Sequence, residues 1–150
     1  MAEDTSVWFC ILDRERGRLL EGRYVPNGRL HLDERARLDN PWTEMRIGGA
    51  IVPRKRHKDG LRFARNEQGD KDLRFGREAC AWIERELVAR RIALLHLFCP
   101  PHFLGVLRHT GGGKLLARVT EHEADLAHLS AGELAAHRAI VQAMEAALER

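Results

Sequence analysis

The most localised source of chemistry in this sequence is a basic segment, residues 54–77. It holds nine Lys or Arg residues against four Asp or Glu residues, a local charge of +5, so the remainder of the chain totals −2 of the overall +3. Cationic side chains gathered in this way are typical of surfaces that bind RNA phosphates. Phe63 and Phe75 would be available to stack on bases. The residues predicted to bind nucleic acid are Arg54, Lys55, Arg56, Lys58, Arg62 and Arg65. The alternative is a solvated loop that keeps the protein soluble.

A second set of polar residues follows a long apolar stretch. Ile92–Cys99 predicts a buried central strand, and His102, Arg108 and Asp125 come after it. Ligands of open α/β sheets bind in the crevice at the carboxyl ends of the strands, so these three residues would supply the polar groups of a small enzyme. The structural alternative is that His102 and Arg108 are surface or capping residues and that Asp125 forms a turn.

Several other chemistries are disfavoured by residue spacing. Gly111–Lys114 lacks the spacing of a phosphate-binding loop and follows a predicted helix, so no nucleotide cofactor is expected there. The eight histidines form no HxxxH or HExxH pair and the cysteines form no CxxC pair, so we expect no metal. Neither serine stands in a GxSxG sequence. We expect Cys10, Cys80 and Cys99 to be free, buried and unreactive.

The N-terminal part of the chain is predicted to form strands of the sheet that positions these residues. Val7–Leu12 is a continuous apolar run, Arg18–Val25 returns after a turn, and Arg29–Asp33 alternates polar and apolar residues. Turn-forming residues separate the three runs. The pattern predicts a three-stranded antiparallel meander that ends near Leu38.

The middle of the chain has little periodicity. Residues 39–72 contain two prolines, several glycines and most of the basic segment, and they predict a long exposed basic loop in which Ala50–Val52 can form a short strand. Leu73–Arg91 then has the apolar spacing of a helix.

The C-terminal half alternates between helix and strand. Pro100-Pro101 ends the central strand and starts a helix over His102–His109, since the first turn of a helix needs no proline N–H. Leu115–Glu121 predicts a last strand, and Ser130–Glu133 is a capping box that begins a helix to the C-terminus. This order of elements predicts an α/β fold with a mixed β-sheet covered by helices.

The size and the apolar pattern bound the organisation of the chain. Its 150 residues suit one domain, residues 1–150, with the long basic loop at 39–72. The longest apolar run is far too short to span a bilayer, and no signal peptide is visible, so we expect no membrane span and a cytoplasmic location.

Two stretches resemble the paired C-terminal signatures of the bacterial host-attachment family. The first consists of Pro100, Pro101, His102, Phe103, Leu104, Gly105, Val106, Leu107 and Arg108. The second is Asp125–Ser130, followed by Glu133, Leu134 and His137. The sequence departs from the family pattern at His102, where arginine is common, and at Ala124 and Ala127, where lysine and threonine are common.

This resemblance implies a fold similar to the middle domain of archaeal and eukaryotic release factors. Those factors carry a Gly-Gly-Gln loop before their long helix, and the equivalent loop here would be residues 54–72. That loop contains Glu67-Gln68-Gly69 and no Gly-Gly-Gln, so peptide-release chemistry is not expected. The family name implies a role in attachment of bacteria to host cells.

Three functional hypotheses follow. The first is a non-enzymatic binding module that contacts RNA, the ribosome or a protein through the basic loop. The second is the small enzyme with His102, Arg108 and Asp125 at the end of the central strand. The third is an interaction protein that forms a homodimer through the meander edge or the C-terminal helix. Of these we favour the first, without a cofactor.

Overall fold

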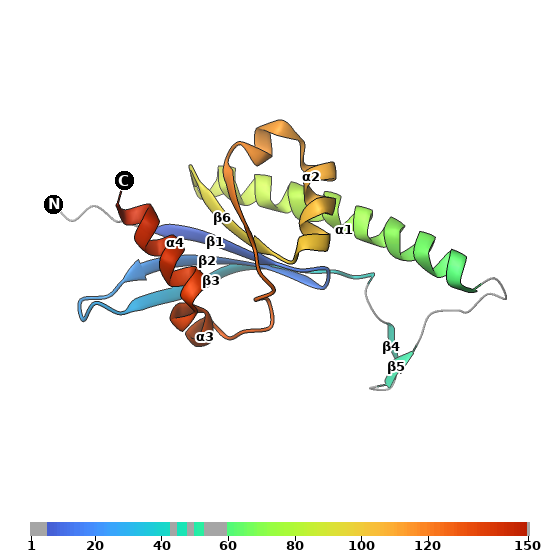
Figure 1. The fold of residues 1–150 in the computed structure, drawn as a ribbon, viewed down its shortest axis with the longest axis horizontal. Helices are drawn as coiled ribbons and strands as arrows, with labels where there is room; N and C mark the ends of the chain where they lie inside the picture. The colour runs from blue at the N-terminus through green and yellow to red at the C-terminus, as the bar shows by residue number, and fades with distance from the viewer. Residues whose placement is uncertain (1–5, 43–44, 48–49, 53–59, 150) are drawn as a thin grey trace.

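A five-stranded mixed sheet forms the centre of the computed structural model, which describes residues 6–42, 45–47, 50–52 and 60–149 (Figure 1). The strands β1 (Val7–Leu12), β2 (Arg16–Tyr24) and β3 (Leu30–Asp39) form an antiparallel meander, as the sequence predicts. Next to β1 lie β6 (Leu95–Cys99) and β7 (Val119–Glu123), both parallel to it, so the strand order is β3-β2-β1-β6-β7.

Helices cover both faces of this sheet. The helices α1 (Gly60–Ala89) and α2 (Pro101–Leu116) pack on one face, and the short α3 (Ala131–Ala136) and α4 (Arg138–Leu148) pack on the other (Figure 1). The predicted α/β class, a mixed sheet covered by helices, is therefore confirmed.

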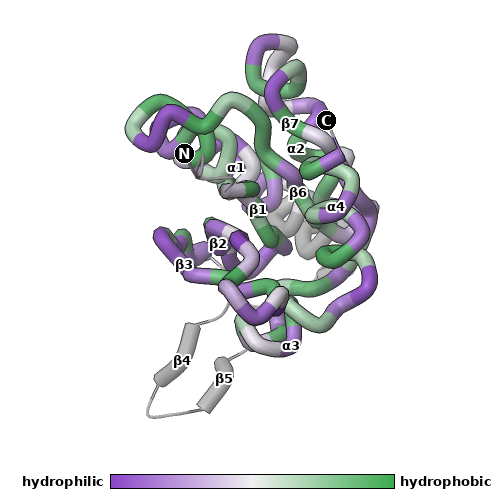
Figure 2. The backbone as a smooth tube through the Cα atoms, turned by 90° about the vertical axis from the view of Figure 1, so that its left-hand side faces the viewer, coloured by the Kyte–Doolittle hydropathy of each residue, from purple (hydrophilic) through white to green (hydrophobic). Residues whose placement is uncertain are grey.

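Alternation along the central strands divides the core into two apolar layers. In β1, Cys10 and Leu12 face α1 and α2, whereas Phe9 and Ile11 face α3 and α4. The central strand, predicted over Ile92–Cys99, begins at Leu95 and is buried from there to Cys99, whereas Ala93 and Leu94 before it are exposed. Hydrophobic residues accordingly concentrate in β1 and β6, and the edge strand β3 is mostly hydrophilic (Figure 2).

The predicted loop over residues 39–72 is wrong in its second half, because α1 begins at Gly60 instead of Leu73. Residues 61–71 include many strong helix formers, among them Leu, Arg, Ala, Glu, Gln and Lys. Their preference outweighs Gly69, since one glycine inside a helix costs only about 1 kcal/mol. The predicted strand at Ala50–Val52 is present as β5 and pairs with β4 (Met45–Ile47), which was not predicted.

The C-terminal half contains three further departures. The last strand, predicted over Leu115–Glu121, is β7 at Val119–Glu123, because α2 continues to Leu116. The helix predicted to end near His109 continues through a kink at Gly112, whose φ of 75° and ψ of 165° lie outside the helical region. The helix predicted to run unbroken after Ser130 stops at His137, which has extended backbone angles and separates α3 from α4. His137 Nδ1 accepts a hydrogen bond from the Ala139 N–H (3.1 Å), so this side chain caps α4. The capping box of Ser130 and Glu133 is confirmed.

None of the helices in the described part of the chain is both long and apolar enough to cross a membrane.

Candidate functional site

The basic segment is only partly described by the structure. Arg54, Lys55, Arg56 and Lys58 lie outside the described residues. Arg62 and Arg65 belong to the first turns of α1, where the description is limited to the backbone. Phe75 is fully buried in the core, so the prediction that it is available to stack on bases is wrong.

Farther along α1, the basic segment has side chains that the structure does describe. Arg74 and Arg77 are exposed, and neither makes an ion pair with any residue in the described ranges. The neighbouring Asp72 does not neutralise them, because its side chain is only 5% exposed and binds Arg14 and His102 instead. Arg74 and Arg77 are therefore two exposed cations on this part of the helix that have no carboxylate partner among the described residues.

The clearest concave feature at the carboxyl edge of the sheet is a groove of about 510 Å³. Its lining comes from the turn after β1, the start of α2 and the segment after β7. The lining residues are Asp13, Arg14, Glu15, Arg16, Pro100, His102, Phe103, Asp125 and His128. The chain leaves β6 toward α2 on one face and leaves β7 toward α3 on the other, and such divergence opens a crevice at the strand ends. We call this feature the carboxyl-edge groove.

A buried carboxylate organises one wall of the carboxyl-edge groove. Asp72 Oδ2 accepts a hydrogen bond from Arg14 Nη2 at 2.9 Å and lies 3.3 Å from His102 Nε2. The His102 side chain itself is 70% exposed. An ionised carboxylate only accepts hydrogen bonds, so the Nε2 that faces it carries the hydrogen and Nδ1 is left as an acceptor.

The opposite wall is held in place by a buried arginine. Arg18, on β2, donates from Nη1 to the carbonyl oxygens of Ala127 and Leu129, and from Nε to Glu34. These bonds tie the segment after β7, which carries His128, to the meander. The three hydrogen bonds account for the burial of this charged side chain.

Only two of the three residues in the predicted enzyme site come together. His102 and Asp125 both line the carboxyl-edge groove. Arg108 does not; it lies two turns along α2 and forms an ion pair with Glu121 on β7, with Nη2 2.7 Å from Oε1. The prediction that Arg108 shares this site is therefore wrong, because a helix that starts at the groove carries residue 108 away from it.

Folding explains most of the two signature stretches. Pro100 and Pro101 occupy the N-cap and first position of α2, and Phe103 and Leu104 are buried beneath it. In the second stretch, Leu126 and Ala127 are buried in the core and Ser130 caps α3. Gly105 is exposed, and a methyl group on it would meet nothing within 4 Å. Arg108 forms an ion pair with Glu121 outside the groove, whereas His102, Asp125 and His128, whose side chains neither pack in the core nor cap a helix, line the carboxyl-edge groove.

Sequence reasoning missed two residues of this site, Arg14 and Asp72. Arg14 was assigned to a turn and Asp72 to the basic loop. They are 58 residues apart, and no periodicity relates them to each other or to His102. Asp72 is one of four acidic residues in the basic segment, and nothing in the local sequence distinguishes it from the other three.

The remaining buried histidine and cysteine residues belong to the core. His96 is buried on β6, and its Nδ1 lies 3.0 Å from Nε2 of His122 on β7. Burial lowers the pKa of His122. Cys10, Cys80 and Cys99 are free and buried, and burial raises the pKa of each thiol, so none is reactive. Within the described residues, no group of three or more His, Cys, Asp or Glu side chains could hold a metal ion.

Comparison with known proteins extends over most of the chain. Residues 8–137 match the model of a protein family described as "protein required for attachment to host cells". The matched range runs from β1 to the end of α3, so it contains both signature stretches and all the lining of the carboxyl-edge groove. No curated protein matches the sequence.

Proposed function

This chain belongs to the family of proteins required for attachment to host cells, and we propose that it serves as a binding module that contacts RNA through its basic segment. The family description names a process and no ligand, so the proposal rests on the distribution of charge.

The observation that carries the proposal is the pair of uncompensated arginines on α1. Arg74 and Arg77 are exposed and form no ion pair with any described residue, whereas every arginine within β2 and β3 does. An arginine that must break its contact with a carboxylate to bind a phosphate contributes less free energy of binding than an arginine without such a partner.

The shape of the molecule supports the same proposal. The helix α1 is continuous from Gly60, so Arg62, Arg65, Arg74 and Arg77 belong to one element. Its N-terminal half extends beyond the strands (Figure 1). Over its whole length α1 is neutral, but its projecting half, residues 60–74, holds four basic residues against three acidic ones. This half can lie along a nucleic acid backbone without a clash with the body of the protein.

Burial of Phe75 determines the kind of binding that we expect. Without this ring as a stacking platform, phosphate contacts dominate the affinity. Binding should therefore depend steeply on salt and only weakly on base sequence.

The test measures the dissociation constant of two fluorescent single-stranded RNAs of unrelated sequence over a range of salt concentrations. The double substitution R74A/R77A should weaken the binding of both RNAs alike and should lower the slope of log K against log salt by about 1.4. R138A is the matched control, because Arg138 is exposed on α4, on the other face of the sheet. Equal binding by R74A/R77A and the control variant would refute the proposal. The proposal would also be refuted if the wild type captured a protein partner in the presence of nuclease and R74A/R77A did not. The two arginines would then recognise a protein.

A further inference from the structure

We propose that the carboxyl-edge groove is a hydrolytic site for carboxylic esters, in which His102 removes a proton from the attacking water. This inference concerns a site separate from Arg74 and Arg77 and does not depend on RNA binding.

The geometry of His102 is the first support. Its side chain is 70% exposed, yet its Nε2 faces Asp72, whose side chain is only 5% exposed. A buried carboxylate behind an exposed imidazole fixes the orientation and tautomer of the ring and stabilises the imidazolium that forms when Nδ1 takes a proton. Arg14 lies on the same carboxylate oxygen and offsets part of the cost of burying it. A purely structural partner for Asp72 would need no exposed ring nitrogen.

The start of α2 is the second support. Its N-cap residue, Pro100, makes no side-chain capping bond, and Pro101 has no N–H. The first amide of α2 that donates to a backbone carbonyl within the described chain is that of Leu104, which bonds to the Pro100 oxygen at 2.9 Å. The N–H groups of His102 and Phe103 therefore remain as donors at the groove, where they can bind an oxygen that gains negative charge.

The charges around the groove indicate which esters it would accept. Arg14 and Arg16 are each paired with a carboxylate, Asp72 and Glu15 respectively. Asp13 and Asp125 add further negative charge to the lining. An anionic substrate, such as a phosphate ester or the ester of a dicarboxylic acid, would be repelled. The site therefore favours esters whose acyl group is uncharged or positively charged.

The reaction needs water and no other reactant. Nδ1 of His102 takes a proton from water as the water oxygen bonds to the carbonyl carbon, and the carbonyl electron pair moves to oxygen, near the first amides of α2. When this intermediate collapses, the bond between the carbonyl carbon and the alcohol oxygen breaks. The imidazolium returns its proton to the departing alkoxide. The products are a carboxylic acid and an alcohol, and His102 is neutral again.

The test uses the full chain and two chromogenic esters, 4-nitrophenyl acetate and its anionic counterpart, the 4-nitrophenyl ester of succinic acid. The wild type should hydrolyse the neutral ester faster than an equal concentration of imidazole and should discriminate against the anionic ester. H102R, which places a cation beside Asp72 but supplies no base, should be at least tenfold less active. H109Q, which changes another exposed histidine of α2, should lose none.

The positioning role of Asp72 has its own readout. In D72N the imidazolium that forms in the reaction loses its counter-charge, so kcat should fall while KM stays unchanged. R74A/R77A should hydrolyse esters like the wild type, which separates this site from RNA binding. A wild-type rate no greater than that of imidazole, or full activity in H102R, would overturn the proposal.

Discussion

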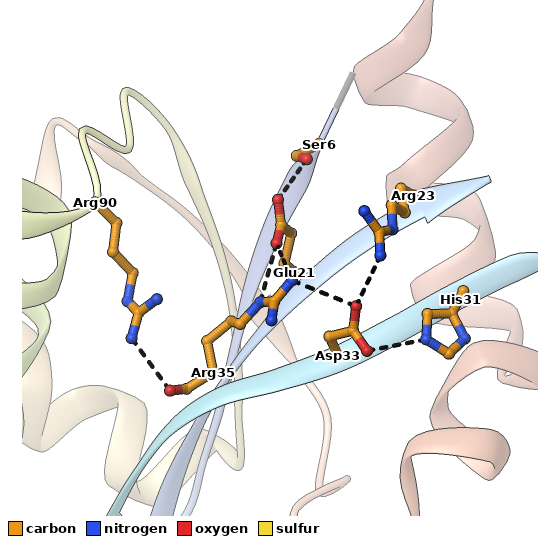
Figure 3. A network of polar contacts seen from close by, with 7 residues as sticks. All are labelled: Ser6, Glu21, Arg23, His31, Asp33, Arg35 and Arg90. Carbon is orange, nitrogen blue, oxygen red and sulfur yellow. Dashed lines mark hydrogen bonds and ion pairs between the residues drawn. The ribbon is translucent and has the colours of Figure 1, made fainter. Parts of the chain in front are cut away.

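The meander and α1 are both rich in arginine, but they use it in opposite ways. In the meander each arginine of β2 and β3 contacts a carboxylate. The contacts of Arg23 and Arg35 join into a network around Glu21 and Asp33 (Figure 3). Glu21 accepts from Ser6 and Arg35, while Asp33 accepts from Arg23 and Arg35 and contacts His31. On α1, Arg74 and Arg77 have no such partner among the described residues. The number of basic residues is thus a poor guide to a binding surface, and the number left without a carboxylate is a better one.

Strand register explains the difference. Glu21 pairs with Asp33 across β2 and β3, so Arg35 stands diagonally opposite Glu21 and can reach it. On α1 the acids at one turn from Arg74 are Asp70 and Glu78, but neither forms an ion pair with it, and the buried Asp72 is bound by Arg14 and His102.

The largest effect should come from Arg18, the buried arginine of the meander. R18A removes three hydrogen bonds and leaves the carbonyls of Ala127 and Leu129 and the Glu34 carboxylate without their donor. The free energy of unfolding should therefore fall by about 3 kcal/mol. Its control is R37A, which changes the residue paired with Arg18 on β3 but breaks only an exposed contact to Asp39, at a cost within about 0.5 kcal/mol. Urea denaturation measures both. Equal losses would mean that burial does not distinguish the two arginines.

A smaller effect is expected from pH at Glu21. The Ser6 hydroxyl, and after it Arg35, hold the pKa of this carboxyl below its usual value despite its burial. A lowered pKa in the folded state stabilises the fold above the unfolded value of 4.5, and this stabilisation is lost as pH falls through the folded pKa. Denaturation curves below pH 5 should therefore show a weaker pH dependence in E21Q than in the wild type. The same dependence in both would exclude Glu21 as the cause.

The smallest effect on stability should come from the uncompensated arginines. R74A/R77A removes no ion pair with a described residue and should change the free energy of unfolding by no more than about 0.5 kcal/mol. A loss of 2 kcal/mol or more by urea denaturation would show that these arginines have a structural role, as those of the meander do.

Local patterns were sufficient to predict the architecture. The apolar run at Val7–Leu12, the buried strand that ends at Cys99 and the capping box at Ser130 each depend on neighbours in the chain, and all three were predicted correctly. The start of α1 was predicted wrongly, at Leu73 instead of Gly60, because a glycine can indicate a loop but is also tolerated inside a helix. The similarity to the release-factor middle domain remains a prediction.

The site was harder to predict than the fold. His102 and Asp125 were identified, because they follow directly from strands that end at one edge. Arg108 was included wrongly, since its distance from the groove depends on the direction of α2. Arg14 and Asp72 were missed because their contact exists only after α1 packs against the sheet. Contacts between residues far apart in sequence carry no periodicity that a single sequence can reveal.

The central claim, that the basic segment contacts RNA, is tested most directly by the salt dependence of RNA binding. The variant has alanine in place of Arg54, Lys55, Arg56 and Lys58, and it is compared with the wild type on one single-stranded RNA. We expect weaker binding at every salt concentration and a slope of log K against log salt that is lower by about 3. Unchanged retention of RNA at low salt, with an unchanged slope, would contradict the account.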